Sequence, residues 1–235
     1  MRLILFDIDG TLIDSGGAGT RSLNLAFREL FSIQSAFIGI NMAGKTDLQI
    51  IKECLAVHGV QSGSSAIPEV MGAYLRHLRK EIQNDKKHMK PGVPGVLHAL
   101  GKENGLYCSG LLTGNIEQGA RIKLESFGLN AYFPSGAFGS DHEDRNKLLP
   151  VALRRFAEMG NKGIAYRDCV VVGDTPRDVF CAKPYGAFCI GVATGPYAAG
   201  ELVEAGADVV FEDLSDTGAF LRAVEARSFS GTLPV

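Results

Sequence analysis

The stretch LILFDIDGTLID, residues 3–14, decides how the rest of the chain is interpreted. Its first four residues are apolar, as is typical of a short strand buried on both faces of a sheet. Asp7 and Asp9 follow directly, and Asp14 comes a few residues later. A buried strand that ends in clustered carboxylates needs something to compensate their charge. The stretch therefore raises the question of what these aspartates bind.

Further apolar runs alternate with helical patterns along the chain. The runs cover residues 106–113, 169–173, 187–193 and 208–211. The helical patterns cover residues 93–102, 117–127, 148–159, 178–185 and 198–205. Alternating strands and helices are typical of an α/β fold with a parallel sheet. The sequence thus predicts a doubly wound, mostly parallel, Rossmann-like sheet as the core.

Residues 15–87 interrupt this alternation with helical patterning and no convincing strand. Three helices are expected there, from Thr20 to Phe31, from Thr46 or Asp47 to Val57, and from Pro68 to about Asn84. We therefore expect an inserted all-helical cap domain over residues 15–87. The core domain would consist of residues 1–14 and 88–235. The final stretch, residues 227–235, has weak periodicity, which predicts partial disorder or a course across the surface.

The charge, the cysteines and the apolar runs of the chain indicate which partners and which location to expect. The formal net charge is −2 and basic runs are short and mixed, so no nucleic-acid partner is expected. The five cysteines form no CxxC pair, which favours reduced thiols over a disulfide framework or a zinc site. No apolar run suits a signal peptide or a membrane span. We expect a cytoplasmic protein with no membrane partner, either a monomer or a homodimer.

Small, polar or acidic residues follow three of the predicted strands. Asp7 and Asp9 follow the first, TGN (residues 113–115) the second, and GDTPRD (residues 173–178) the third. In an open α/β sheet, ligands bind at the carboxyl ends of the strands. If the strands are parallel, Asp7, Asp9 and Asp174 converge at one edge. Converging carboxylates stay ionised only beside a cation, and oxygen ligands without His or Cys favour Mg²⁺.

The same edge offers donors for an anion. Backbone N–H groups near Gly10, Gly114 and Asn115 could bind one, and Thr113 adds a hydroxyl. A metal on one side and hydrogen-bond donors on the other describe a site for phosphoryl transfer. Either Asp7 or Asp9 alone could be an ordinary turn residue at a strand end. Together with Asp174 and TGN, they favour a functional site.

These motifs resemble those of the haloacid dehalogenase-like hydrolases. DIDGTLID, TGN, a basic residue before a helix, and GDTPRD occur in the same order, and the resemblance covers nearly the whole chain. The subgroup it is most similar to has a helical cap after the first strand, as in phosphoglycolate phosphatases. The acid at Asp9 resembles the phosphatase and phosphomutase branch, since the dehalogenases proper lack it.

The resemblance implies a role for each matching residue. Asp7 would be the nucleophile that forms an aspartyl-phosphate, and Asp9 would protonate the leaving oxygen and then activate water. Asp7, the backbone carbonyl of Asp9, and Asp174 would hold Mg²⁺, with Asp178 orienting these ligands. The phosphoryl group would be bound by Thr113, Gly114 and Asn115.

Two basic positions leave alternatives open. Arg145 and Lys147 both precede the helix at residues 148–159, and the spacing favours Arg145, although the family usually has a lysine there. Arg can bind phosphate through two donors, so the exchange is chemically reasonable. Lys45 lies on a glycine-flanked loop of the cap. It would either contact the substrate or be a solvated lysine near a helix start.

The expected function is hydrolysis of a small phosphorylated metabolite by a Mg²⁺-dependent phosphatase of the phosphoglycolate phosphatase type. One alternative is a phosphotransferase of the β-phosphoglucomutase type, which would return the phosphoryl group to a sugar. Another is a catalytically inactive binding or regulatory protein, because a fold alone does not guarantee activity.

Overall fold

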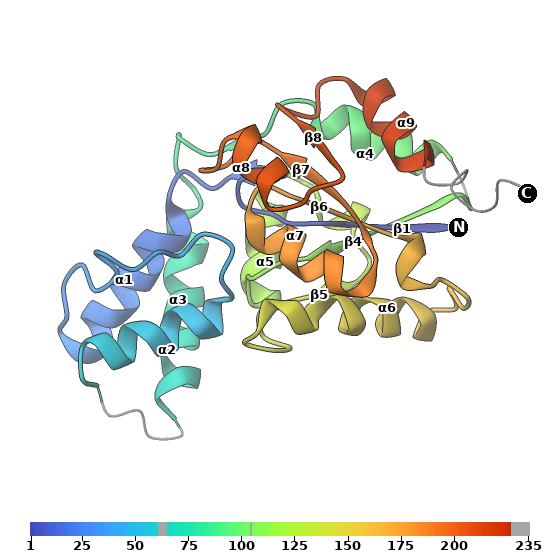
Figure 1. Ribbon diagram of the computed structural model, residues 1–235. Helices are drawn as coiled ribbons and strands as arrows, with labels where there is room; N and C mark the ends of the chain where they lie inside the picture. Colours follow the sequence, from blue (N-terminus) through green and yellow to red (C-terminus); the bar gives the residue numbers. More distant parts are fainter. Residues whose placement is uncertain (61–64, 104, 227–235) are drawn as a thin grey trace, which may run out of the picture.

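The computed structural model describes residues 1–60, 65–103 and 105–226 of the chain. Within these residues, six parallel strands form one sheet in the order β5-β4-β1-β6-β7-β8 (Figure 1). The predicted α/β fold is confirmed, while the prediction for residues 227–235 lies outside the described residues. The strands of this sheet are β1 (Arg2–Phe6), β4 (Tyr107–Leu112), β5 (Gly136–Ala137), β6 (Cys169–Gly173), β7 (Phe188–Val192) and β8 (Val209–Phe211).

Helices cover both faces of the sheet because the buried strands are apolar on both sides. In β1, Ile4 and Phe6 pack with α4, α5 and α9 on one face. Leu3 and Leu5 pack with α6 and α7 on the other. The core helices are α4 (Val93–Lys102), α5 (Glu117–Glu125), α6 (Leu148–Glu158), α7 (Pro176–Ala182), α8 (Ala199–Glu204) and α9 (Thr217–Ala226).

Two core elements lie outside the predicted alternation. Strand β5 has two residues, too few to show a strand period in sequence. Helix α9 was not predicted, although Phe220 and Val224 bury one face of it against α4 and the sheet. Four short 3₁₀ turns complete the described core, at Asn130–Tyr132, Arg145–Lys147, Tyr166–Asp168 and Lys183–Tyr185.

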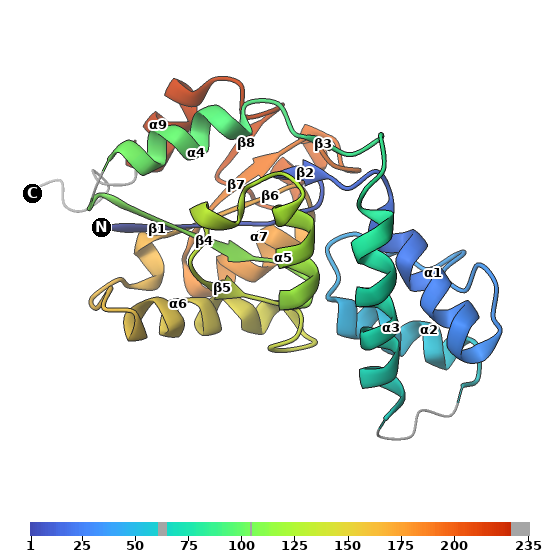
Figure 2. The same ribbon diagram turned by 180° about the vertical axis from the view of Figure 1, so that it is seen from behind.

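The inserted helices form a separate layer beside the sheet (Figure 1). They are α1 (Ala18–Phe31), α2 (Asp47–Val57) and α3 (Ala66–Glu81), and they share a hydrophobic cluster of their own. The two connections to the core pair as a short antiparallel ribbon of β2 (Ile13–Asp14) and β3 (His88–Met89), labelled in Figure 2. This ribbon adjoins the predicted boundaries of the cap.

Two predicted helix starts in the cap are wrong. Helix α1 begins at Ala18 instead of Thr20, because Gly16 and Gly17, both with positive φ, turn the chain earlier. Helix α3 begins at Ala66, since the first turn of a helix tolerates Pro68. Helix α2 does begin at the predicted position, where the Thr46 hydroxyl accepts a hydrogen bond from the backbone of Gln49.

All five cysteines are free thiols in this structure, and four of them are buried. Among the described residues, no helix combines the length and apolar character that spanning a bilayer would need.

Candidate active site

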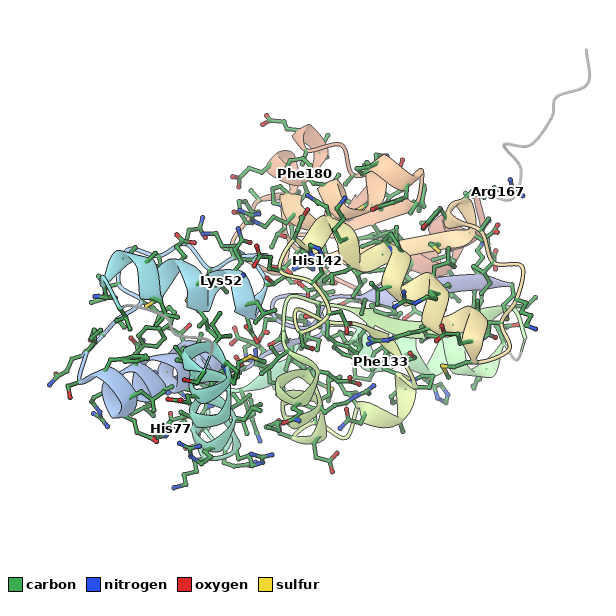
Figure 3. All side chains as sticks on the ribbon, turned by 90° about the horizontal axis from the view of Figure 1, so that it is seen from below. Lys52, His77, Phe133, His142, Arg167 and Phe180 are labelled. Carbon is green, nitrogen blue, oxygen red and sulfur yellow. The ribbon has the colours of Figure 1, made fainter. Side chains whose placement is uncertain are left out.

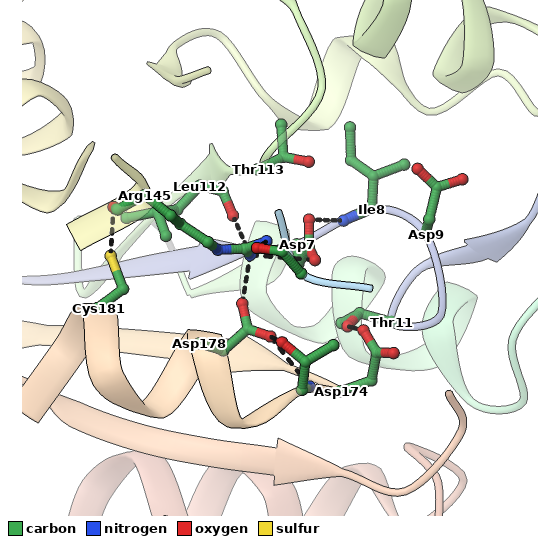
Figure 4. Close-up of polar contacts among 12 residues, drawn as sticks. Asp7, Ile8, Asp9, Thr11, Leu112, Thr113, Arg145, Asp174, Asp178 and Cys181 are labelled. Carbon is green, nitrogen blue, oxygen red and sulfur yellow. Dashed lines mark hydrogen bonds and ion pairs between the residues drawn. The ribbon is translucent and has the colours of Figure 1, made fainter. Parts of the chain in front are cut away.

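Three buried carboxylates lie together at the carboxyl edge of the sheet. Asp7 directly follows β1, Asp174 directly follows β6, and Asp178 lies in the first turn of α7. One oxygen of each lies within 4.8 Å of the others. Figure 4 shows the three side chains gathered around Arg145. Parallel pairing of β1 with β6 brings the two strand ends to the same edge. The structure thus brings Asp7 and Asp174 together, as the motifs predicted.

The guanidinium of Arg145 enters this cluster from the turn before α6. Its Nη2 lies 3.0 Å from Oδ2 of Asp7 and forms an ion pair with Asp178 (Figure 4). Its Nη1 donates to the backbone oxygen of Gly44 in the cap at 3.1 Å. Arg145 is 4% exposed, whereas Lys147 is exposed to solvent. Arg145, and not Lys147, is therefore the cation beside Asp7.

The charge of this cluster is unbalanced, because three carboxylates face a single guanidinium. Burial and the charges of Asp7 and Asp178 raise the pKa of Asp174 well above its usual range. Burial also raises the pKa of Asp178, although the nearby Arg145 opposes this. An excess of buried negative charge carried by oxygen atoms fits a hard divalent cation such as Mg²⁺.

Asp9 has a different set of partners. Its Oδ2 accepts hydrogen bonds from Nδ2 of Asn115 at 2.9 Å and from Nζ of Lys123 at 2.5 Å. Burial would raise the pKa of Asp9, but the charge and hydrogen bond of Lys123 and the hydrogen bond of Asn115 outweigh it and lower that pKa. Asp9 is therefore ionised at neutral pH. Asp7 and Asp9 thus lie in different environments, since Arg145 faces Asp7 while Lys123 and Asn115 bind Asp9.

The TGN segment after β4 joins the core to the cap. The hydroxyl of the buried Thr113 accepts a hydrogen bond from Nδ2 of Asn115 at 2.9 Å. A Cβ on Gly114 would lie 2.1 Å from the backbone oxygen of Lys45, so only glycine permits this close approach. Gly114 and Asn115 line the cavity described below, whereas Thr113 lies behind them and orients Asn115.

Asp47 docks the cap on the TGN segment. Its backbone N–H donates to the oxygen of Gly114 at 2.7 Å, and its Oδ2 accepts from the N–H of Ile116 at 2.9 Å. Burial raises the pKa of Asp47 to about 6, although Lys123 opposes this rise. The cap therefore presses a carboxylate against the core in an environment that disfavours its ionised form.

A second contact joins the cap to the loop before Arg145. The hydroxyl of Thr46 donates to the backbone oxygen of Glu143 at 2.6 Å. Lys52 of α2 forms an ion pair with Glu143, next to the exposed His142, where α2 meets the core in Figure 3. The cap is thus closed over the strand ends in this structure.

A cavity of about 500 Å³ lies between the cap and the strand ends. Asp7 and Asp174 line it from the core, and Tyr74 lines it from the cap. Lys45 also lines this cavity, is 12% exposed and pairs with Glu53, so the interpretation as a solvated lysine is wrong. The volume suits a small molecule enclosed on most sides.

Two residues of this region were missed in the sequence. Lys123 is buried at 4% exposure and contacts Asp9, while Asp47 docks the cap. Lys123 could have been noticed in the sequence, because it is a charged residue on the apolar face of its helix, beside Ala120 and Leu124. The docking role of Asp47 could not be seen in the sequence, because its partner Ile116 lies 69 positions away along the chain.

Comparison with known proteins places this site in a family. The profile of the haloacid dehalogenase-like hydrolases matches residues 4–192, from the middle of β1 to the end of β7. The chain belongs to this family.

Named relatives cover most of the chain. Phosphoglycolate phosphatase of Rhodospirillum rubrum is 29% identical over 224 residues, covering 94% of this chain and 90% of that protein. Phosphoglycolate phosphatase of Agrobacterium fabrum is 26% identical, covering 91% and 89% of the two chains. Similarity thus extends through the cap as well as the core.

Solved structures share the fold. A hydrolase from Pseudomonas syringae superposes with a TM-score of 0.71 at 23% identity, covering 94% of this chain and 98% of that one. CbbY from Rhodobacter sphaeroides, solved in complex with phosphate, gives a TM-score of 0.72 at 20% identity, covering 93% and 97%. At these identities the likeness concerns the architecture.

Proposed function

We propose that the chain is a Mg²⁺-dependent phosphatase that hydrolyses a small phosphorylated metabolite of the phosphoglycolate type through an aspartyl-phosphate. The observation that carries this proposal is the group of three buried carboxylates and one guanidinium at the cavity between the cap and the strand ends. The phosphoglycolate phosphatases among the relatives support the substrate class.

The bound metal would be held by the side chains of Asp7 and Asp174 and by the backbone carbonyl of Asp9. When bound, Mg²⁺ would offset the carboxylate charge and the charge that develops on the phosphoryl oxygens. Asp178 would keep Arg145 in place through their ion pair. Arg145 would in turn hold the nucleophile and offset part of its charge.

Asp7 is held for attack by two contacts. Its Oδ1 accepts from the N–H of Ile8 at 2.8 Å, and its Oδ2 faces Arg145. A carboxylate oxygen of Asp7 would form a bond to phosphorus while the bond from phosphorus to the ester oxygen breaks. Asp9 would donate a proton to that leaving oxygen. Water would then attack phosphorus, give its proton to Asp9 and release phosphate from Asp7.

Asp9 needs two protonation states in this sequence. The lowered pKa of Asp9 keeps this carboxyl ionised at neutral pH, and the ionised form is the one that can accept a proton from water in the second step. The first step needs the protonated acid, and a nearby phosphate ester raises the pKa of a carboxyl by like-charge repulsion. Binding of the anionic substrate therefore prepares Asp9 for proton donation.

Lys45 would contact the substrate from the cap, since it lines the cavity. Gly114 and Asn115 would bind the transferring phosphoryl group, while Thr113, predicted as a third phosphoryl ligand, lies outside the cavity lining and would hold Asn115 in place. We also infer a cytoplasmic enzyme, since free thiols persist in a reducing compartment. It would act as a monomer or homodimer.

The test is a panel of phosphate esters that includes phosphoglycolate, other phosphorylated acids and sugar phosphates, each assayed with and without Mg²⁺. We expect Mg²⁺-dependent release of inorganic phosphate, and loss of turnover in Asp7→Asn with the fold intact. Acid-quenched wild-type enzyme should carry phosphate on the peptide that contains Asp7. Asp85→Asn, at an exposed carboxylate, is the matched control.

Other outcomes would redirect the proposal. A sugar phosphate isomer that accumulates in place of free phosphate would support phosphoryl transfer. Full activity of Asp7→Asn would refute the mechanism. Failure of every ester on the panel would favour a binding role for the fold.

A further inference from the structure

Lys123 is a lysine buried at the boundary between core and cap. It is 4% exposed, and Ala120 and Leu124 beside it on α5 belong to the hydrophobic core. A Cβ placed on Gly19 of α1 would lie 3.4 Å from Nζ of Lys123, so the cap covers the ammonium closely. Burial of an ammonium costs free energy unless its partners replace water. The partners of Lys123 therefore indicate what this charge does.

These partners form a closed triangle. Nζ of Lys123 donates to Oδ2 of Asp9 at 2.5 Å and to Oδ1 of Asn115 at 2.6 Å. Asn115 completes it by donating Nδ2 to the same Oδ2 of Asp9 at 2.9 Å. Both donors bind Oδ2 of the carboxylate, and the side chain of Ser15 is a further hydrogen-bond partner of Asp9. The triangle fixes the rotamer of Asp9 from one side.

We propose that Lys123 is a positioning residue for Asp9, which it holds together with Asn115 so that Oδ1 can exchange a proton with the leaving oxygen. This inference rests on the proposed function, because it concerns the proton transfer assigned there to Asp9. Proton transfer requires a donor within hydrogen-bond reach of the reacting oxygen. A carboxylate without these two partners would sample other rotamers. Lys123 acts through Asp9 and does not contact the reacting atoms.

The test compares leaving groups. Lys123→Met keeps an apolar side chain of similar length and removes the ammonium. An alkoxide leaves poorly without a proton, whereas p-nitrophenolate leaves readily without one. We expect kcat/KM to fall roughly ten- to a hundredfold with phosphoglycolate and ethyl phosphate, but less than about threefold with p-nitrophenyl phosphate. Lys80→Met removes an exposed lysine of α3 and should leave all three values unchanged.

Two patterns would overturn the proposal. An equal loss with all three substrates would show that Lys123 only supports the fold. A loss of kcat/KM confined to phosphoglycolate would show that the Lys123 ammonium binds the carboxylate of the substrate instead of positioning Asp9.

A second measurement uses an Asp9→Asn background. There, Lys123→Met should cost less than about twofold with phosphoglycolate, because residues that act through one another are not additive. A further tenfold loss would show that Lys123 acts independently of Asp9 and would refute the proposal. If the wild-type enzyme hydrolyses no ester at all, the proposed function fails, and this inference with it. Wild-type turnover combined with any contrary pattern overturns the role of Lys123 alone.

Discussion

Arg145 is the residue on which the geometry of the carboxylate cluster depends. Its two terminal nitrogens contact Asp7, Asp178, and the backbone oxygens of Gly44 and Leu112. A lysine has one nitrogen with three donors and cannot contact four acceptors arranged around a planar fork. The arginine that replaces the usual lysine of the family therefore has a structural role as well, because the same side chain also binds the cap loop at Gly44.

We predict that Arg145→Lys lowers kcat/KM roughly ten- to a hundredfold, because the ammonium cannot hold Asp7 and Asp178 together. Steady-state kinetics with phosphoglycolate measure this effect. Lys147→Met, at an exposed position two residues away, should stay within about twofold of wild type. Loss of activity in the Lys147 variant with retention in Arg145→Lys would reverse the assignment.

At the scale of elements, the loop after β7 closes the cluster from the other side. The hydroxyl of Thr194 donates to the backbone oxygen of Gly10 at 2.5 Å. A Cβ on Gly195 would lie 1.7 Å from Oδ2 of Asp174, closer than any real contact. Gly195 and Gly10 thus leave space for the Asp174 carboxylate. The close packing against Asp174 thus explains why position 195 is a glycine.

We predict that Gly195→Ala weakens Mg²⁺ binding roughly ten- to a hundredfold, because the new methyl group displaces the carboxylate of Asp174. Isothermal titration of the purified protein with Mg²⁺ measures this directly. Gly200→Ala is the matched control, since a Cβ there meets no atom within 4 Å. Unchanged Mg²⁺ affinity in Gly195→Ala would exclude Asp174 as a ligand.

Some strands and helices of this fold could be predicted from the sequence, and others could not. The strands before Asp7 and Asp174 were predictable because continuous apolar runs end abruptly in acidic residues. Strand β5 could not be predicted, because two residues are too few to show the alternation of a strand. It forms by pairing with β4. Lys123 was visible only as a charge on an apolar helix face. Its partner Asp9 lies 114 positions away, a separation that helical periodicity cannot bridge.

At the scale of the whole molecule, contacts between the cap and the core lie directly beside the cavity. The ribbon of β2 and β3 forms the covalent connection, with Lys90 lying 3.6 Å from Asp14 across it. Asp47 forms the contact at the other side of the cavity, on the segment that contains Gly114. Asp47 thus ties the cap to the TGN segment, and the strength of this link can be measured by substituting Asp47.

Asp47 should make the stability of the protein depend on pH. Its pKa rises from 3.8 to about 6 on folding, chiefly through burial. Between these values the folded chain binds a proton that the unfolded chain has lost. The free energy of unfolding should therefore fall as the pH rises through this window. Above it, the folded chain contains a buried charge.

We predict that Asp47→Asn removes this loss, because the amide oxygen can still accept the hydrogen bond from Ile116 without a charge. The variant should gain about 1–3 kcal/mol relative to wild type at pH 7.5 and little at pH 4.5. Urea denaturation at both pH values measures the difference, in which the shared titration of the other acids cancels. Asp85→Asn, at an exposed position, should show no such change. A stability difference between Asp47→Asn and wild type that does not vary with pH would show that burial of the cap carboxylate is fully compensated by Lys123.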